Sequence, residues 1–197
     1  MLMFKKTAVF GLVAASLVMQ GCAGFRANNI PLVQPEQIAF TGADKTKVYS
    51  QWTVQSSTTK LNDQTQVALA AVAKKQFEDQ LNLTNCCIVV ESRDAADVVI
   101  QAVSHNNNNP AAMVGALLTG FSLYTIPSWV TVNVHVTADV KADEKTFKYD
   151  TQDSMKMVQW LPMALMFPFA NPFPMEKAVA ENVQKTLIAN MKRDGVL

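Results

Sequence analysis

The chain has 197 residues and a mass of 21.6 kDa, which is room for one ordinary domain or for one domain with a tail. Charged residues make up 17% of the chain, 49% are hydrophobic, and the formal net charge is +1. A typical soluble domain has about 25% charged residues. These values exclude a polybasic nucleic-acid binder, a strongly acidic tail protein and a disordered chain. Three cysteines are too few for a disulfide-dense scaffold.

The first residues have the pattern of a secretory signal. Lys5 and Lys6 form a positive start, and an apolar stretch follows from Thr7 to Met19. Such a stretch is typically about 7–15 residues long in a signal peptide, whereas a membrane-spanning helix needs about 20. We therefore expect residues 1–21 to be a signal peptide that the mature protein loses.

The next residues, Met19-Gln20-Gly21-Cys22, resemble the lipobox of bacterial lipoprotein precursors. Gln20 is bulkier than the Ala or Ser usual at its place. The resemblance implies cleavage before Cys22, a diacylglycerol on its sulfur and an acyl chain on its new amine, and several acyl chains give lasting membrane attachment. Because Ala23 and not Asp follows, the family's sorting rule favours the outer membrane. The alternative is an ordinary signal peptide with a chance cysteine.

The mature chain has no excess of positive charge. Removing Lys5 and Lys6 from the 17 basic residues leaves 15 against 16 acidic residues, a net charge of −1. Attachment to a membrane therefore has to come from acyl chains and apolar surface rather than from attraction to anionic lipid. Few periodic apolar residues occur over 22–46, which predicts a lipidated tether, and 47–197 is the predicted single periplasmic domain.

The periodicity of apolar residues predicts seven elements in this domain. We expect strands at 47–55, 87–91, 97–104, 129–140 and 146–157, and amphipathic helices at 63–81 and 176–193. In the clearest strand, 129–140, valines alternate with polar residues such as Thr131 and His135. The order β-α-β-β-β-β-α predicts the α+β class, as a two-layer domain with a mostly antiparallel sheet, two helices on one face and a polar opposite face.

Two apolar segments, expected to be loops, interrupt this order at Ala111 to Ile126 and at Val158 to Pro174. If strand 97–104 pairs with 129–140, both segments emerge at the same end of the sheet. The tether reaches that end too if strand 47–55 starts there. We interpret this end as a membrane- or partner-facing tip. Its aromatic residues are Phe121, Tyr124, Trp129, Trp160, Phe167, Phe169 and Phe173. In the alternative, one segment is a buried helix and the other a proline-rich covering loop.

The sequence contains no recognisable catalytic or metal-binding motif. His105 and His135 are the only histidines, and their spacing is not that of a metal site. Cys86 and Cys87 are interpreted as two small buried residues at a strand entrance rather than as redox thiols. We therefore expect neither a metal nor a cofactor, apart from the covalent lipid on Cys22.

These observations predict a non-enzymatic accessory or assembly factor, lipid-anchored to the outer membrane and facing the periplasm. It would bind another envelope component or the membrane through its apolar tip, and it would not bind nucleic acid. The strand Ala96-Asp97-Val98-Val99-Ile100 also resembles, weakly, a strand of small α+β envelope lipoproteins, including the curli-secretion type. A ring- or pore-forming secretion lipoprotein and a carrier of lipid or another apolar ligand are the two alternatives.

Overall fold

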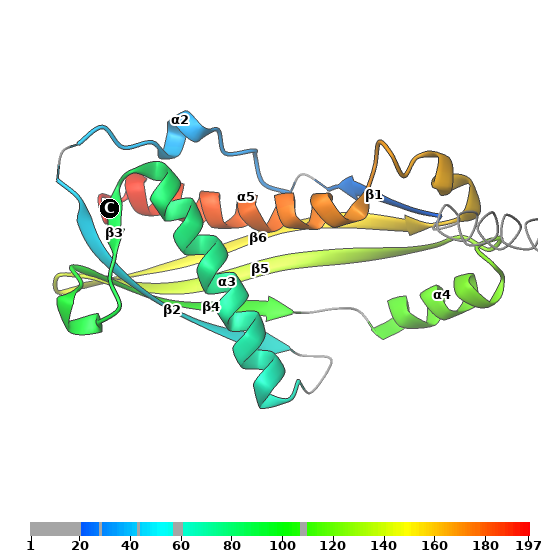
Figure 1. Cartoon of the computed structure of the whole chain (residues 1–197), viewed down its shortest axis with the longest axis horizontal. Coiled ribbons are helices and arrows are strands. Elements are labelled where there is room, and N and C mark those ends of the chain that lie inside the picture. Colours follow the sequence, from blue (N-terminus) through cyan, green and yellow to red (C-terminus); the bar gives the residue numbers. More distant parts are fainter. Residues whose placement is uncertain (1–20, 28, 43, 57–60, 107–109) are drawn as a thin grey trace, which may run out of the picture. The chain divides into compact units, whose positions relative to one another are not determined.

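The structure of the chain is a computed structural model that describes residues 21–27, 29–42, 44–56, 61–106 and 110–197 (Figure 1). The predicted signal peptide lies outside the described residues, except for Gly21.

Six strands form one sheet in the order β1-β6-β5-β4-β2-β3. Their bounds are Cys22–Arg26 (β1), Thr46–Ser56 (β2), Cys87–Val89 (β3), Val98–Asn106 (β4), Ser128–Ala142 (β5) and Lys145–Gln159 (β6). β1 is antiparallel to β6, and β4 is antiparallel to β5, whereas β2 runs parallel to both β3 and β4. The prediction of an α+β fold with a mostly antiparallel sheet is confirmed.

Within the described residues, four α-helices and two 3₁₀ turns accompany the sheet (Figure 1). They are α2 (Pro35–Ile38), α3 (Asp63–Thr84), η1 (Arg93–Ala95), α4 (Pro110–Phe121), η2 (Leu161–Leu165) and α5 (Pro172–Arg193). Asn62 caps α3 by accepting a hydrogen bond from the Thr65 N–H at 2.7 Å, and Asn85 ends it in a left-handed conformation, φ 60°. Both devices are encoded locally, which is why the sequence predicts this helix well.

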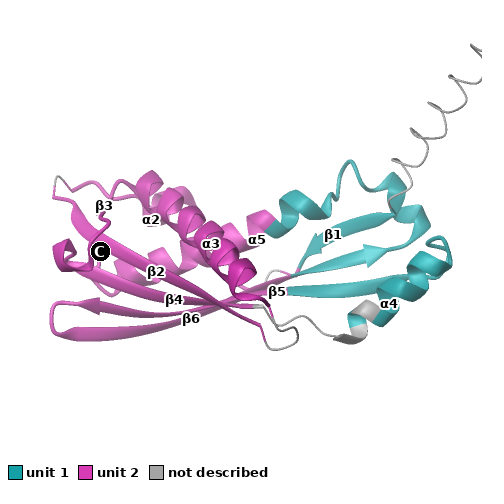
Figure 2. Cartoon of the chain, turned by 60° about the horizontal axis from the view of Figure 1, so that its bottom comes forward, with its two compact units in different colours: residues 1–26, 109–132, 155–176 teal, residues 27–108, 133–154, 177–197 magenta. Residues whose placement is uncertain are grey.

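The chain divides into two compact units (Figure 2). Unit 1 comprises residues 1–26, 109–132 and 155–176, and unit 2 comprises residues 27–108, 133–154 and 177–197. Strands β5 and β6 contribute residues to both units.

Unit 2 contains the hydrophobic core. Alternate residues of β2, β4 and β5 point to one face, where Val48, Ile100 and Val140 are fully buried. Phe77 of α3 and Leu187 of α5 lie in the same buried cluster. The two long helices therefore cover one face of this part of the sheet, as the apolar faces of both helices predict. The polar residues that alternate along β5 are on the other face.

Residues 22–46 form less of a free tether than the sequence predicts. β1 joins the sheet, and the residues after it are held to unit 2 by side chains of α5. The buried Asn182 accepts from the Val33 N–H at 3.0 Å and donates to the Pro31 carbonyl at 3.1 Å. Lys192 donates to the Gln37 and Ala39 carbonyls at 3.2 and 2.6 Å. Buried partners distant in sequence thus fix a segment that has no periodicity of its own.

The direction of β2 corrects one step of the predicted topology. Ser56 at the end of β2 pairs with Asn106 at the end of β4, so β2 does not start where β4 finishes. The reason is that β3 and β4 lie on opposite sides of β2, and the connection through η1 crosses over instead of making a hairpin. The predicted route, in which residues 22–46 reach the apolar segments because β2 starts beside them, is therefore wrong.

The two apolar segments are also more ordered than the loops that the sequence predicts. The first forms α4, which begins at Pro110, where the fixed φ of proline suits the first turn of a helix. The second contains η2 and then the first turn of α5, which begins at Pro172 rather than at Glu176. Prolines that break a helix in its interior are tolerated in its first turn, because the N–H groups there have no helical partner.

Candidate functional site

Helix α4 of unit 1 turns its apolar residues outward. Val114, Leu117, Leu118 and Phe121 are all exposed, and Phe121 retains 82% of its accessible surface. They follow the i, i+3, i+4, i+7 spacing of a single helix face. Thr119 is instead buried, and its hydroxyl donates to the carbonyl one turn earlier at 3.0 Å. The arrangement is the reverse of that in an ordinary surface helix of a soluble domain.

The two apolar segments meet just after α4. Leu123 and Tyr124 both have positive φ, 50° and 61°, a rare conformation for residues with bulky side chains. The turn directs the Tyr124 carbonyl toward the second segment, where the Leu161 N–H donates to it at 2.8 Å. This hydrogen bond connects residues that are far apart in the sequence within one unit.

The second segment also exposes large apolar side chains, among them Leu165 and Phe169, which retain 81% and 85% of their accessible surface. Together the two segments form what we call the apolar surface of unit 1. Its exposed residues are Val114, Leu117, Leu118, Phe121, Leu123, Ile126, Trp129, Trp160, Leu161, Leu165, Met166, Phe169 and Phe173. Beside α4 it includes an apolar hollow of about 550 Å³, lined by Ala116, Leu117, Gly120 and Phe121.

Charge is nearly absent from this unit. Within residues 21–26, 109–132 and 155–176, the only charged side chains are Arg26, Lys156 and Glu176. Exposed apolar area of this extent usually marks a surface that contacts another molecule or a membrane.

Five of the seven predicted tip residues are exposed on the apolar surface, namely Phe121, Trp129, Trp160, Phe169 and Phe173, whereas Tyr124 and Phe167 are half-buried. Sequence reasoning that searched for aromatic residues missed the aliphatic stripe of α4. The i, i+3, i+4, i+7 spacing of Val114, Leu117, Leu118 and Phe121 was the signal that could have found it.

Cys22, the predicted lipidation site, lies in the same unit as both segments. It pairs with Gln159 at the end of β6, and the Trp160 N–H donates to the Gly21 carbonyl at 2.6 Å. It is the free cysteine of the described chain, and its partial burial raises the pKa of the thiol above the ordinary value. The start of β1 thus adjoins the second apolar segment directly, by a route different from the one predicted.

A second candidate site is the polar face of the sheet in unit 2. His105 and His135, opposite each other on β4 and β5, stack with ring centroids 4.6 Å apart. Nε2 of His105 lies 2.9 Å from the Thr137 hydroxyl, and Nε2 of His135 lies 2.9 Å from an Asp150 oxygen. Burial, followed by the charge of His135, lowers the pKa of His105, and Asp150 opposes this shift. The pair therefore favours a neutral His105.

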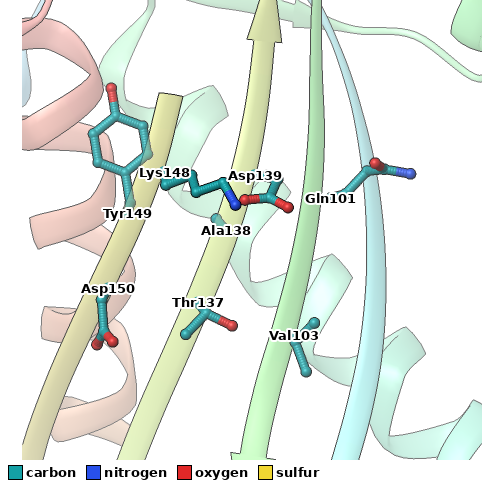
Figure 3. Close-up of a pocket in the computed structure, with 8 residues that line it drawn as sticks. All are labelled: Gln101, Val103, Thr137, Ala138, Asp139, Lys148, Tyr149 and Asp150. Atoms are coloured by element: carbon teal, nitrogen blue, oxygen red, sulfur yellow. The ribbon is translucent and has the colours of Figure 1, made fainter. Parts of the chain in front are cut away.

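A shallow hollow of about 270 Å³ lies on the same face (Figure 3). Asp139 and Lys148 point toward each other across β5 and β6, while Gln101 and Val103 come from β4. These are groups of a solvated sheet surface. Among the described residues, no group of three or more His, Cys, Asp and Glu side chains is placed to hold a metal ion.

Cys86 and Cys87, whose redox state the sequence leaves open, are joined by a disulfide. Both residues are buried at the entrance of β3, as predicted. Within the described part of the chain, no helix has both the length and the apolar character needed to cross a bilayer.

No protein-family model and no curated protein matches the sequence. Several solved structures are similar at low identity, and we describe three of them. An uncharacterized protein is 10% identical, over 76% of this chain and 91% of the other, with a TM-score of 0.39. A PelC dodecamer variant from Paraburkholderia phytofirmans is 8% identical, over 85% of this chain and 99% of the other, with a TM-score of 0.37. The hypothetical protein CT253 from Chlamydia trachomatis is 11% identical, over 74% of this chain and 96% of the other, with a TM-score of 0.38. Similarity at this level carries no information about function.

Proposed function

We propose that this protein is a lipoprotein of the bacterial outer membrane that faces the periplasm and is anchored through Cys22. It acts as a non-enzymatic accessory or assembly factor, and its apolar surface binds the membrane or another component of the envelope. The observation that carries the proposal is the presence, in one unit with almost no charge, of both the lipobox cysteine and the exposed apolar surface.

The chemistry of the apolar surface favours contact with lipid over contact with a charged partner. The charge-free stretch 109–132 offers no lysine or arginine to anionic headgroups and no carboxylate to a basic protein. Trp129 and Trp160 are of the residue type that favours the headgroup zone of a bilayer, while the leucines and phenylalanines favour its apolar interior. Contact with neutral lipid therefore costs this surface less desolvation than contact with a charged partner.

The anchor is tested by Cys22→Ser in cells, with Gln20→Ala as the matched control. Gln20→Ala brings the lipobox closer to the family pattern and should leave the protein in the outer-membrane fraction with the mass of its acyl chains. Cys22→Ser should lose that mass, and a larger share of the protein should leave the outer-membrane fraction, because only the apolar surface still holds it there. An unmodified Cys22 in the purified wild-type protein contradicts the proposal.

The apolar surface is tested separately, with the non-acylated Cys22→Ser protein and vesicles of zwitterionic phosphatidylcholine. Trp52 is buried in unit 2, so a Trp52→Phe background leaves Trp129 and Trp160 as the fluorescent reporters. Binding should shift their emission to shorter wavelength. Charged substitutions Phe121→Asp and Phe169→Asp should weaken vesicle binding without unfolding the protein. Val67→Asp, at an apolar residue of α3 in unit 2 that is also largely exposed, should leave binding unchanged.

The outcomes separate the alternatives. Equal loss of binding in all three Asp variants would show that unit 1 has no special role. If the protein does not bind vesicles but forms a large ring when extracted from membranes, the result would favour the ring- or pore-forming lipoprotein. Co-purified lipid in the Cys22→Ser protein would favour the carrier.

A further inference from the structure

The backbone at Gly21 is held closely against the second apolar segment. Its carbonyl accepts the Trp160 N–H at 2.6 Å, next to the first β1–β6 pair, Cys22 with Gln159. A Cβ added at Gly21 would lie 2.8 Å from the Trp160 carbonyl carbon and 3.0 Å from the Leu161 Cα, and closer still to the Trp160 oxygen. These are backbone atoms, which shift less easily than the end of a flexible side chain. The site accepts a carbonyl followed by an unbranched CH₂ group and nothing wider.

Processing of a lipoprotein cuts the bond that holds this carbonyl in place. Hydrolysis of the Gly21–Cys22 peptide bond removes Gly21 as a carboxylate and leaves a free amine on Cys22. N-acylation then forms a new C–N bond to this amine, as the ester bond of a phospholipid acyl donor breaks. The lysophospholipid leaves as an alcohol and takes the proton that the amine loses. The product is again an amide, with a carbonyl on the Cys22 nitrogen and an unbranched CH₂ behind it.

We propose that the carbonyl of the N-acyl chain on Cys22 takes the place of the Gly21 carbonyl and accepts the backbone N–H of Trp160. The acyl amide and the Gly21 peptide both have a carbonyl and then an unbranched CH₂ on the Cys22 nitrogen, so the narrow site fits the first two carbons of a fatty acyl chain. This inference rests on the proposed lipidation of Cys22. It assigns the Trp160 N–H, together with the backbone around Leu161, as a binding site for the acyl group of the chain's own anchor.

The form of the protein that lacks the N-acyl group differs at the Trp160 N–H. Its Cys22 carries an amine, which near neutral pH is largely a protonated donor and offers no acceptor to the Trp160 N–H. The two processed forms therefore differ at this one hydrogen bond, whereas the neighbouring Leu161 N–H keeps the Tyr124 carbonyl, 2.8 Å away, in both. Leu161 is a matched internal control.

The experiment compares the complete mature protein purified in detergent from cells with and without the N-acyltransferase activity. Mass spectrometry first verifies that both forms carry the diacylglycerol and that only one carries the third chain. Hydrogen exchange of the backbone amides is then followed by NMR. We expect the Trp160 amide to exchange roughly fivefold more slowly in the N-acylated form, because only this form has an acceptor for the Trp160 N–H, and one net hydrogen bond has an effect of this size. The Leu161 amide should exchange equally in the two forms.

Equal exchange at Trp160 in the two forms would overturn the inference. So would an equal slowing at Trp160 and Leu161, because it would mean that the third chain rigidifies the region without a specific contact. A purified protein with no diacylglycerol at all would overturn the proposed function as well. Failure of the anchor and failure of the acyl-binding site are therefore separate results.

Discussion

Unit 1 and unit 2 differ in where most of their large apolar side chains lie. In unit 2, large apolar residues such as Phe77 and Leu187 are fully buried, and charged residues cover the outside. In unit 1, the fully buried positions include the small or polar Ala23 and Thr119, while Phe169 and other large apolar residues are exposed. The arrangement in unit 2 is the one expected of a protein surrounded by water, because burial of apolar area stabilises the fold. The second arrangement fits the proposed contact of this surface with another apolar phase.

The strongest test of this contrast removes one phenylalanine from each unit. Phe77→Ala leaves a cavity beside Trp52, whose ring centroid lies 5.3 Å away, and should lower the free energy of unfolding by about 3–5 kcal/mol. Phe169→Ala should change it by less than about 0.5 kcal/mol, since the side chain is already exposed. Urea denaturation followed by tryptophan fluorescence measures both values. A large loss in Phe169→Ala would mean that this residue belongs to a core.

The next test concerns the segment that α5 holds against unit 2. Asn182→Ala removes the partners of the Val33 N–H and the Pro31 carbonyl, and should cost roughly 1–3 kcal/mol. The segment after β1 should become more sensitive to limited proteolysis, which mass spectrometry of the fragments locates. If cleavage there is unchanged, the two hydrogen bonds do not hold the segment.

A smaller effect is expected at the turn that joins the two apolar segments in unit 1. Leu123 has φ 50°, which asparagine adopts more easily than leucine. Leu123→Asn should therefore stabilise the protein by about 1 kcal/mol as the strain is relieved. Thermal unfolding of the Cys22→Ser protein, with and without this substitution, measures the change. A lower melting temperature would show that the leucine side chain contributes packing that outweighs the strain.

The smallest effect is a pH dependence of unit 2. Burial and the charge of His135 lower the pKa of His105 in the folded protein, against the opposing charge of Asp150. The folded state thus disfavours the protonated ring, so this contribution to stability is present above the unfolded pKa, about 6.5, and is lost as the pH falls below it. Asp139 and Lys148 line the hollow on the same face. Urea midpoints should fall between pH 7.5 and 5, and less so in His105→Gln.

Periodicity predicted most of unit 2 and little of unit 1. Strand 129–140 and helix 63–81 could be read from alternation and from the Asn62 cap, because burial against one face imposes a period on the sequence. The pairing partners of β2 could not be read in this way, since both of its neighbours are parallel and the local pattern is the same for either direction. The apolar segments contain no charged residue and few polar ones, so their hydrophobic pattern alone does not tell an inward face from an outward one.

The exposure of α4 had a signal in the spacing of Val114, Leu117, Leu118 and Phe121, but the same spacing is typical of a helix that turns these residues inward. Only the three-dimensional structure decides between the two, through the buried Thr119 on the opposite side. The hydrogen bond from Leu161 to Tyr124 is likewise a product of tertiary structure. Local sequence encodes neither, because both depend on residues that are distant along the chain.

The scarcity of charge in unit 1 also determines how its contacts can be detected. No lysine or arginine occurs between Arg93 and Lys141, or between Lys156 and Lys177. Amine-reactive cross-linkers therefore have no target within the apolar surface, and trypsin releases it as two long hydrophobic peptides, 94–141 and 157–177, that are recovered poorly. A survey of envelope interactions based on lysine chemistry would miss this face of the protein. A photoreactive amino acid at Leu117 or Phe169, with chymotrypsin in place of trypsin, would reach it.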